Sequence, residues 1–519
     1  MARLLVCLSC LLVLVLASAP SAQAAKRCPV PGAGDWAEAT PAEAGMDEER
    51  LRDAIDYATE NNALAVRVYR YGCRVGEDSA ATANRNTQFE SWSMAKSATA
   101  LVFGRAMTLG LMGPDDPLGS LLPEADLPHG QITMRDLLTM TSGLRWNGAR
   151  DYNIFMPDRI REALAMEVEK PPGTYWEYSQ SGPALLAEAV ARGTAEDFQA
   201  FAQRELFGKL GIDDNAWYWR RDSAGHTQGF FGLNMRADDF ARLGELMRRG
   251  GKWGGKRLLS KRFAREAIEP VPQSGCYGWL IWLNSSKPCV GPRLETRPVD
   301  PERMYPSLPA DLYQYSGLSG QRVTVMPGQG LVVVRLGNDG GTFTGGADWE
   351  EELYRRVLNS ITDGAVRYPP PGPDAGRVSE DDVDRGFSEA FADPGQYLTP
   401  TTPPPLPPAG PRRARAALIN FRVRRPTADG RVKVRLRCPR AWPSGLRPRC
   451  AGKARLVNAG APLAYRIRAG KIRTLRLPIA ARAERRLERK HRLAVTIKTR
   501  NRDRHRGAVA KRRLVLRPR

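Results

Sequence analysis

A serine and a lysine three residues apart are the first side chains in this sequence with a spacing that suits chemistry. Ser93 and Lys96 stand where an apolar stretch predicts a helix over Met94–Leu109, ended by Gly110. Residues three apart share one helix face, so the amine can reach the hydroxyl. A desolvated lysine can accept the hydroxyl proton, and the helix N-terminus offers N–H groups to an oxyanion. Taken alone, the pair fits a helix cap followed by a solvated lysine better than a catalytic pair.

Two later motifs add groups that such chemistry needs. Tyr178-Ser179-Gln180 places a tyrosine where it can relay protons and protonate a leaving group. Its structural alternative is a turn tyrosine before the helix predicted over Pro183–Arg192. Tyr315–Gln321 contains a Ser-Gly step that lets backbone approach a substrate closely and offer N–H groups to an oxyanion. The alternative there is an ordinary glycine-rich turn.

Periodic segments around these motifs predict the elements that must position them. The predicted helices are 51–59, 94–109, 183–192 and 236–249, and the predicted strands are 64–70, 321–326 and 331–336, the last two joined by a turn at 327–330. This mixture indicates an α+β fold, with an antiparallel sheet flanked by helices and a separate helical region.

The charge of the chain is divided between an acidic body and a basic tail. Residues 401–519 contain 36 lysines and arginines and 4 acidic residues, a net of +32, whereas residues 1–400 have a net of −9. A chain of 519 residues is also long enough for several domains. We expect a signal peptide at 1–24, an α+β domain at 25–395, a proline-rich linker at 396–414 and a small all-β, sandwich-like domain at 415–519.

The N-terminal segment has the pattern of an exported protein. Arg3 precedes an apolar run over 4–17, and Ala22-Gln23-Ala24 fits a signal-peptidase site. A membrane anchor fits less well because the run is short.

Six cysteines follow the expected cleavage site, and an even number in an exported chain favours disulfides. Their spacing suggests the pairs Cys276–Cys289 and Cys438–Cys450, which leaves Cys28–Cys73, although the sequence alone does not exclude other connectivities. With four histidines and no Cys-x-x-Cys after the signal peptide, we expect no metal site.

The three motifs, in this order, resemble those of the serine β-lactamase-related family, which includes class C β-lactamases, D-amino-acid peptidases and esterases. The closer likeness is to its 6-aminohexanoate-dimer hydrolase-like branch. Further matching segments are 109–118, 219–225, 237–244 and, above all, Ile132–Leu144, which contains Asp-Leu-Leu-Thr-Met-Thr-Ser-Gly-Leu.

The resemblance implies a fold, a mechanism and roles for individual residues. The implied fold is a helix-flanked sheet plus an all-α lobe, with the active-site cleft between them. Ser93 would attack a carbonyl, Lys96 would take its proton, and Tyr178 would assist the base and protonate the leaving amine or alcohol. The backbone N–H groups of Ser93 and Leu318 would hold the oxyanion, and water would release the acyl-Ser93. No metal or cofactor is implied.

Two departures from the family pattern bear on the substrate. Gln180 stands where the family has asparagine, and Tyr315 where it has the lysine or histidine that holds a β-lactam carboxylate. We therefore expect poor β-lactam turnover and a small amide or ester substrate. The expected substrate-binding residues are Gln180, Tyr315, Ser316, Gly317, Trp146 and Tyr152. For Trp146, Tyr152 and the adjacent Asn153, packing of the helical lobe is an equal alternative.

Other polar side chains are expected to be structural. We interpret His226 as a loop or rim residue, because Ser-x-x-Lys chemistry does not require a histidine. Asp136 and Asp239 are expected to anchor a helix and a loop.

The basic tail has few aromatic residues, namely Phe421, Trp442 and Tyr465, which argues against nucleic-acid binding. Attraction to an anionic cell-wall or membrane surface, or a merely solvated domain, are the two interpretations. The sequence thus predicts a secreted serine hydrolase, associated with the cell wall under the first interpretation of the tail. The alternatives are a catalytically weak penicillin-binding-like receptor, and an adhesin that carries the front domain as a passenger.

Overall fold

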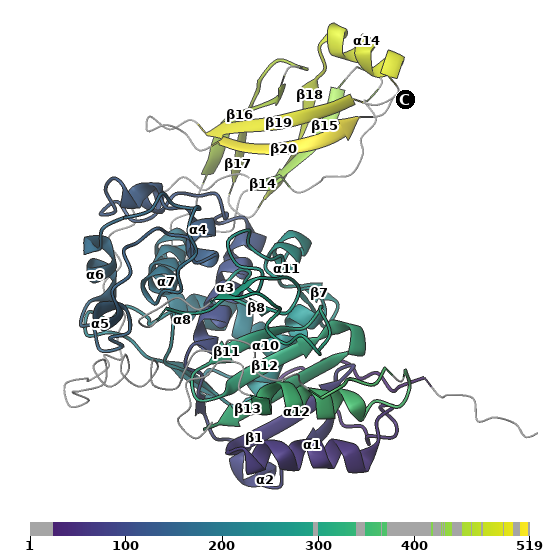
Figure 1. The fold of residues 1–519 in the computed structure, drawn as a ribbon. Helices are drawn as coiled ribbons and strands as arrows, with labels where there is room; N and C mark the ends of the chain where they lie inside the picture. Colours follow the sequence, from purple (N-terminus) through teal and green to yellow (C-terminus); the bar gives the residue numbers. More distant parts are fainter. Residues whose placement is uncertain are drawn as a thin grey trace, which may run out of the picture.

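An antiparallel six-stranded sheet forms the centre of the main domain in this computed structural model (Figure 1). The structure describes residues 24–293, 299–338, 348–364 and 366–370, and further segments between 417 and 516. The strand order is β2-β1-β13-β12-β11-β8, and every neighbouring pair is antiparallel. The strands are β1 (Ala63–Arg70), β2 (Cys73–Glu77), β8 (Trp282–Leu283), β11 (Tyr313–Gly317), β12 (Gln321–Met326) and β13 (Leu331–Gly337).

Helices cover both faces of this sheet. Helices α1 (Glu48–Glu60) and α12 (Asp348–Asn359) share one apolar core with the sheet, and α3 (Met94–Leu109) and α10 (Ala237–Arg248) share another on the opposite face. Gly244 allows α10 to lie close to the sheet, because a Cβ there would be 2.7 Å from a Val323 methyl carbon. Helix α3 ends where the sequence predicts, with Gly110 in the left-handed region at φ 74°.

A helical region adjoins the sheet, as expected (Figure 1). Its central helix, α7 (Ser181–Thr194), is buried on nearly all sides. The remaining helices of the main domain are α4 (Met134–Leu138), α5 (Gly148–Asp151), α6 (Arg159–Ala165), α8 (Phe198–Ala202), α9 (Gly208–Leu210), α11 (Lys261–Glu266) and α2 (Ala81–Asn84), of which α2 lies outside the helical region, beside β1. The short strands are β3 (Phe89–Glu90), β4 (Trp217–Trp219), β5 (Leu233–Met235), β6 (Lys252–Trp253), β7 (Lys256–Arg257), β9 (Cys289–Val290) and β10 (Val299–Asp300).

The basic C-terminal part contains two antiparallel sheets that share one apolar core, as the sandwich prediction requires. The three-stranded sheet consists of β14 (Ala417–Leu418), β15 (Arg431–Arg437) and β18 (Ile472–Pro478), and the four-stranded sheet of β16 (Arg449–Val457), β17 (Leu463–Arg468), β19 (Leu493–Asn501) and β20 (Val509–Leu516). Helix α14 (Ala481–Lys490) was not expected; its Ala483 and Leu487 reach the same core.

Two of the three expected disulfides are present. Cys28 is bonded to Cys73 and Cys276 to Cys289, with Cα–Cα distances of 5.0 and 4.9 Å. The signal peptide up to residue 23, the linker at 396–414 and Cys438 lie outside the described residues. Among the helices that are described, none has the length and apolar character to cross a bilayer.

Candidate active site

Ser93 lies at the start of α3, in a turn that separates it from strand β3. Trp92, the residue before it, has a positive φ of 46°, a conformation that is uncommon for a large side chain. Glu90 holds this turn, because its Oε1 accepts the N–H groups of Trp92 at 3.1 Å and Gly232 at 2.9 Å. The Ser93 hydroxyl caps no helix N–H, so it is available to other partners.

Lys96 is buried and meets three oxygen atoms. Its Nζ lies 2.9 Å from Ser93 Oγ, 2.6 Å from Gln180 Oε1 and 3.3 Å from the Phe230 carbonyl oxygen. Burial holds the pKa of Lys96 well below its usual value, the Asp151 carboxylate opposes this fall, and the Arg159 guanidinium adds to it. A neutral lysine has two N–H donors, which suffice for the amide and carbonyl oxygens. Its lone pair then remains to accept the Ser93 proton.

Tyr178 completes the predicted trio. Its hydroxyl is hydrogen-bonded to that of Ser93, and its ring centre is 4.6 Å from Lys96 Nζ. Burial raises the pKa of Tyr178, and the hydrogen bond with Ser93 offsets only part of the rise. The phenol is therefore neutral at ordinary pH and able to donate a proton. The structure brings Ser93, Lys96 and Tyr178 together, although they come from separate motifs.

The end of β11 passes directly beside the Ser91–Met94 turn that carries Ser93. A Cβ at Gly317 would lie 2.2 Å from the Ser91 carbonyl oxygen and 3.2 Å from the Met94 nitrogen, so only glycine permits this approach. Leu318 follows Gly317 and is partly exposed. An oxyanion site shared by the Ser93 and Leu318 N–H groups requires the end of β11 to lie this close to the start of α3. The joint role of these two N–H groups stays a prediction.

A buried aspartate that the sequence did not single out supports the site. Asp151 accepts the backbone N–H groups of Gln180 at 2.9 Å and Ser181 at 3.2 Å, and the Ser181 hydroxyl at 3.0 Å. It thereby caps α7 and fixes Gln180, whose side chain holds Lys96. Asp151 lies in α5, and no local pattern relates it to α7, 30 residues later.

The predicted substrate-binding residues have different surroundings. Tyr315 is in the core, 1% exposed, and its hydroxyl donates to the Leu243 carbonyl at 3.3 Å. This corrects the expectation that its side chain meets a substrate. Ser316 is partly exposed and pairs with Arg322 on β12. Gln180 contacts Lys96, and Gly317 lies against the Ser91–Met94 turn.

Trp146 and Tyr152 belong to a cluster around Arg293. The Arg293 guanidinium lies 5.4 Å from the Trp146 ring centre and pairs with the Glu177 carboxylate at 3.0 Å. The backbone carbonyl oxygen of Arg293 accepts a hydrogen bond from the Tyr152 hydroxyl at 3.1 Å. Tyr152 is buried, whereas Trp146 is partly exposed. Tyr152 therefore fits the alternative that it packs in the helical lobe. Trp146 keeps exposed surface, so a substrate-binding role for it stays a prediction.

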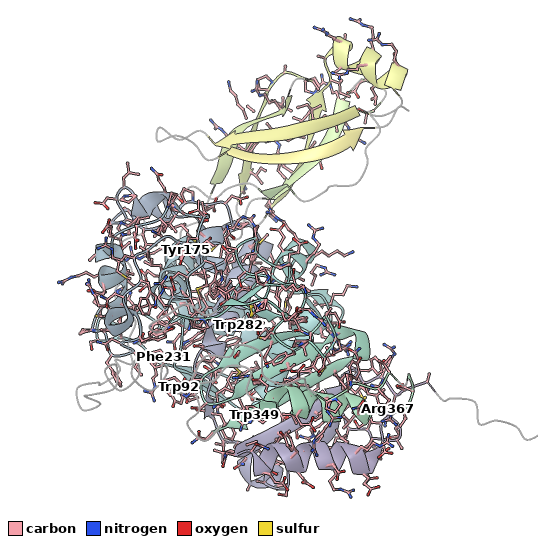
Figure 2. The ribbon with its side chains drawn as sticks, viewed as in Figure 1. Trp92, Tyr175, Phe231, Trp282, Trp349 and Arg367 are labelled. Atoms are coloured by element: carbon pink, nitrogen blue, oxygen red, sulfur yellow. A yellow bond between two sulfur atoms is a disulfide. The ribbon has the colours of Figure 1, made fainter. Side chains whose placement is uncertain are left out.

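Aromatic rings that the sequence did not single out lie near Ser93 and Tyr178; Trp92 and Trp282 are partly exposed, and Phe231 is buried. The Trp282 ring stacks on Tyr178 with centres 5.9 Å apart, and Trp92 lies 6.4 Å from Phe231. In the view of Figure 2, Tyr175 lies above and to the left of Trp282, and Phe231 and Trp92 lie below and to its left. These rings provide apolar surface near the reacting groups.

The remaining polar residues behave as anchors. His226 Nδ1 lies 3.1 Å from Glu188. Burial disfavours its charged form, but Glu188, Asp222 and Asp158 together raise its pKa. Asp136 forms a capping box with Thr133 at the start of α4, and Asp239 pairs with Arg236 at 2.6 Å. Within the described ranges, no group of His, Cys, Asp and Glu side chains is arranged to hold a metal ion.

Comparison with known proteins agrees with this geometry. The chain matches the Beta-lactamase family over residues 51–355. Penicillin-binding protein 4* of Bacillus subtilis is 29% identical over 147 residues, which are 26% of this chain and 32% of that protein. A second Bacillus subtilis protein, described as penicillin-binding protein PbpX, is 27% identical over 138 residues, which are 26% of this chain and 34% of that protein. The chain thus matches about a third of the length of these two curated relatives.

A solved structure from Bacillus anthracis, described as a 6-aminohexanoate-dimer hydrolase, has a similar fold. Its TM-score is 0.50 at 16% identity, over 65% of this chain and 89% of that one. The family match covers more than half of the chain and includes Ser93, Lys96, Tyr178 and Gly317. The chain belongs to the beta-lactamase family of serine hydrolases and penicillin-binding-like proteins.

Proposed function

We propose that this protein is a secreted serine hydrolase that cleaves a small amide or ester through an acyl-Ser93 intermediate. One observation carries the proposal: the buried Lys96 amine has two oxygen acceptors besides Ser93, and its pKa is held low. That arrangement suits a base directed at one hydroxyl rather than a solvated lysine.

The steps follow from these contacts. Lys96 takes the Ser93 proton as Oγ bonds to the substrate carbonyl carbon, and the oxyanion rests on the Ser93 and Leu318 N–H groups. As the oxyanion collapses, the bond to the leaving nitrogen or oxygen breaks, and Tyr178 gives its proton to that atom and recovers one from the Lys96 ammonium. Water then attacks the acyl carbon and its proton passes to Lys96. The bond to Ser93 Oγ breaks, which releases the acid, and the proton returns from Lys96 to Oγ.

The surroundings support an uncharged acyl group as substrate. The buried Tyr315 supplies no cation at the position where relatives of the β-lactamase type hold a carboxylate, and Arg293 is paired with Glu177. The partly exposed rings of Trp92 and Trp282 suit an apolar or aromatic acyl chain. Efficient β-lactam turnover is therefore not part of the proposal.

A fluorophosphonate probe tests the activated serine. We expect one adduct per chain by intact-mass spectrometry of the wild type, and none on Ser93→Ala, because only an ionisable, activated hydroxyl displaces fluoride. Ser97→Ala, which removes a buried hydroxyl on the same helix, is the matched control and should label normally. A folded wild type without an adduct would favour the second candidate, a catalytically weak penicillin-binding-like receptor, which labelled penicillin would then test.

We also propose that the C-terminal domain binds a linear, phosphate-rich wall polymer. Strand register places basic residues directly opposite one another: Lys433 and Arg476 on one sheet, and Arg455, Lys498 and Lys511 on the other. Like charges in such positions disfavour the folded sheet, and a bound polyanion would relieve this.

Long-chain polyphosphate serves as the probe for this surface. We expect the full-length protein to bind it with an affinity that falls steeply with salt, and a Lys433→Glu, Arg455→Glu, Arg476→Glu variant to bind at least about tenfold more weakly. Ester hydrolysis should not change. The control reverses three exposed body lysines: Lys252, Lys256 and Lys261. Equal binding by both variants, or binding to anionic lipid vesicles alone, would overturn the proposal.

A further inference from the structure

A buried ion pair behind the end of β11 is attached to the backbone that the oxyanion would use. We propose that Arg322 and Glu350 are positioning residues that fix and polarise the peptide group between Gly317 and Leu318, aiming the Leu318 N–H at the oxyanion. The inference rests on the proposed hydrolase function and assigns to that site two residues that never touch the substrate.

The contacts join helix α12 to this one peptide group. Arg322 Nε and Nη2 donate to the two carboxylate oxygens of Glu350, at 2.6 and 3.0 Å. Arg322 Nη1 donates to the Gly317 carbonyl oxygen and, at 3.0 Å, to that of Gln321. The exposed fraction is 4% for Arg322 and zero for Glu350. The guanidinium therefore has no solvent partner to draw it away from Gly317.

The hydrogen bond from Arg322 to the Gly317 carbonyl oxygen also sets the direction of the Leu318 N–H. The C=O of Gly317 and the N–H of Leu318 belong to the same planar trans unit and point in opposite directions. On β12, Val323 packs in the core that contains α3, whereas Thr324 meets Tyr354 of α12, so Arg322 lies on the α12 side. Arg322 thus draws the carbonyl toward α12, and the Leu318 N–H is directed to the side where Gly317 meets the Ser91–Met94 turn.

The charge on Arg322 has a second consequence. A cationic donor on the carbonyl oxygen polarises the amide, which makes its N–H a stronger donor. Glu350 allows this charge to be buried, and it is itself held by Gln314 Nε2 and, at 3.4 Å, by the Tyr354 hydroxyl. Burial alone would raise the pKa of Glu350, but the charge of Arg322 and the hydrogen bonds from Arg322, Tyr305 and Gln314 together hold it below its usual value.

The experiment measures the acyl carbonyl directly. With a carbonyl-13C-labelled activated ester, the infrared stretch of acyl-Ser93 reports the hydrogen bonds at the oxyanion site. In Arg322→Met we expect this stretch to move to higher wavenumber and kcat to fall about a hundredfold with little change in KM, since an oxyanion donor is lost from alignment. Glu350→Gln should show a smaller effect of the same sign, and Arg322→Lys should recover part of both.

A second buried ion pair in the sheet provides a control that distinguishes positioning of the oxyanion site from stabilisation of the fold. Arg67 on β1 is paired with Asp78, and both are buried. Arg67→Met should lower the melting temperature without moving the carbonyl stretch. An unchanged stretch and kcat in a folded Arg322→Met, or in Glu350→Gln if the former does not fold, would overturn the inference. Failure of the wild type to acylate would instead refute the proposed function.

Discussion

Replacing Lys96 by methionine is expected to lower kcat/KM for an activated ester by about ten-thousand-fold. Methionine fills a similar volume but cannot accept the Ser93 proton, and the 2.9 Å contact with Oγ is lost. Lys96→Arg should be similarly inactive, because a guanidinium can donate to Gln180 and Phe230 but stays protonated. Steady-state hydrolysis by the two variants therefore separates a base from a hydrogen-bond donor. Substantial activity in either one would contradict the assignment of Lys96 as the base.

The same variant makes the pKa of Lys96 measurable. The amine acts as a base only when neutral, so wild-type kcat/KM should rise with pH through the lowered pKa of Lys96. Between that pKa and about 10.4, the value in the unfolded chain, the unfolded state binds one more proton than the native state. Wild-type stability relative to Lys96→Met should therefore rise by about 1.4 kcal/mol per pH unit in this window. A stability difference independent of pH would mean that Lys96 stays charged.

Local patterns in the sequence predict the contact between Ser93 and Lys96 that the structure shows. Ser93 and Lys96 share one turn of α3, so their contact follows from helix geometry alone. The helix end at Gly110 and the strand pair around Pro327–Gly330 likewise depend on neighbouring residues. Such features are encoded within a few positions, and the structure has them where the sequence predicts.

The residues that support the site were not predictable in this way. Glu90, Asp151 and Glu350 act on partners that are distant in the sequence or on the far face of the sheet. The motif position of Tyr315 predicts a substrate role, but which way a strand side chain points depends on what packs against it. Helix α10 covers that face, so the tyrosine side chain is in the core.

Replacing Asp151 by alanine is expected to lower the free energy of unfolding by about 3 kcal/mol. The change leaves the N–H groups of Gln180 and Ser181, and the Ser181 hydroxyl, without their buried acceptor. It also removes the negative charge that opposes the fall in the pKa of Lys96. The acid limb of the kcat/KM profile should therefore shift to lower pH even as the maximum falls, because Gln180 no longer holds the amine firmly.

Asp47→Ala is the matched control for this prediction. Asp47 caps α1 by accepting the Arg50 N–H at 3.0 Å, and α1 packs on the sheet face opposite α3. Its loss should cost about 1 kcal/mol, measured by urea unfolding, and leave the pH profile unchanged. A loss of stability in Asp151→Ala without a shift of the acid limb would reduce Asp151 to a helix cap. A shift to higher pH would show that the Asp151 charge does not act on Lys96, since removal of a nearby carboxylate can only lower the pKa of an ammonium group.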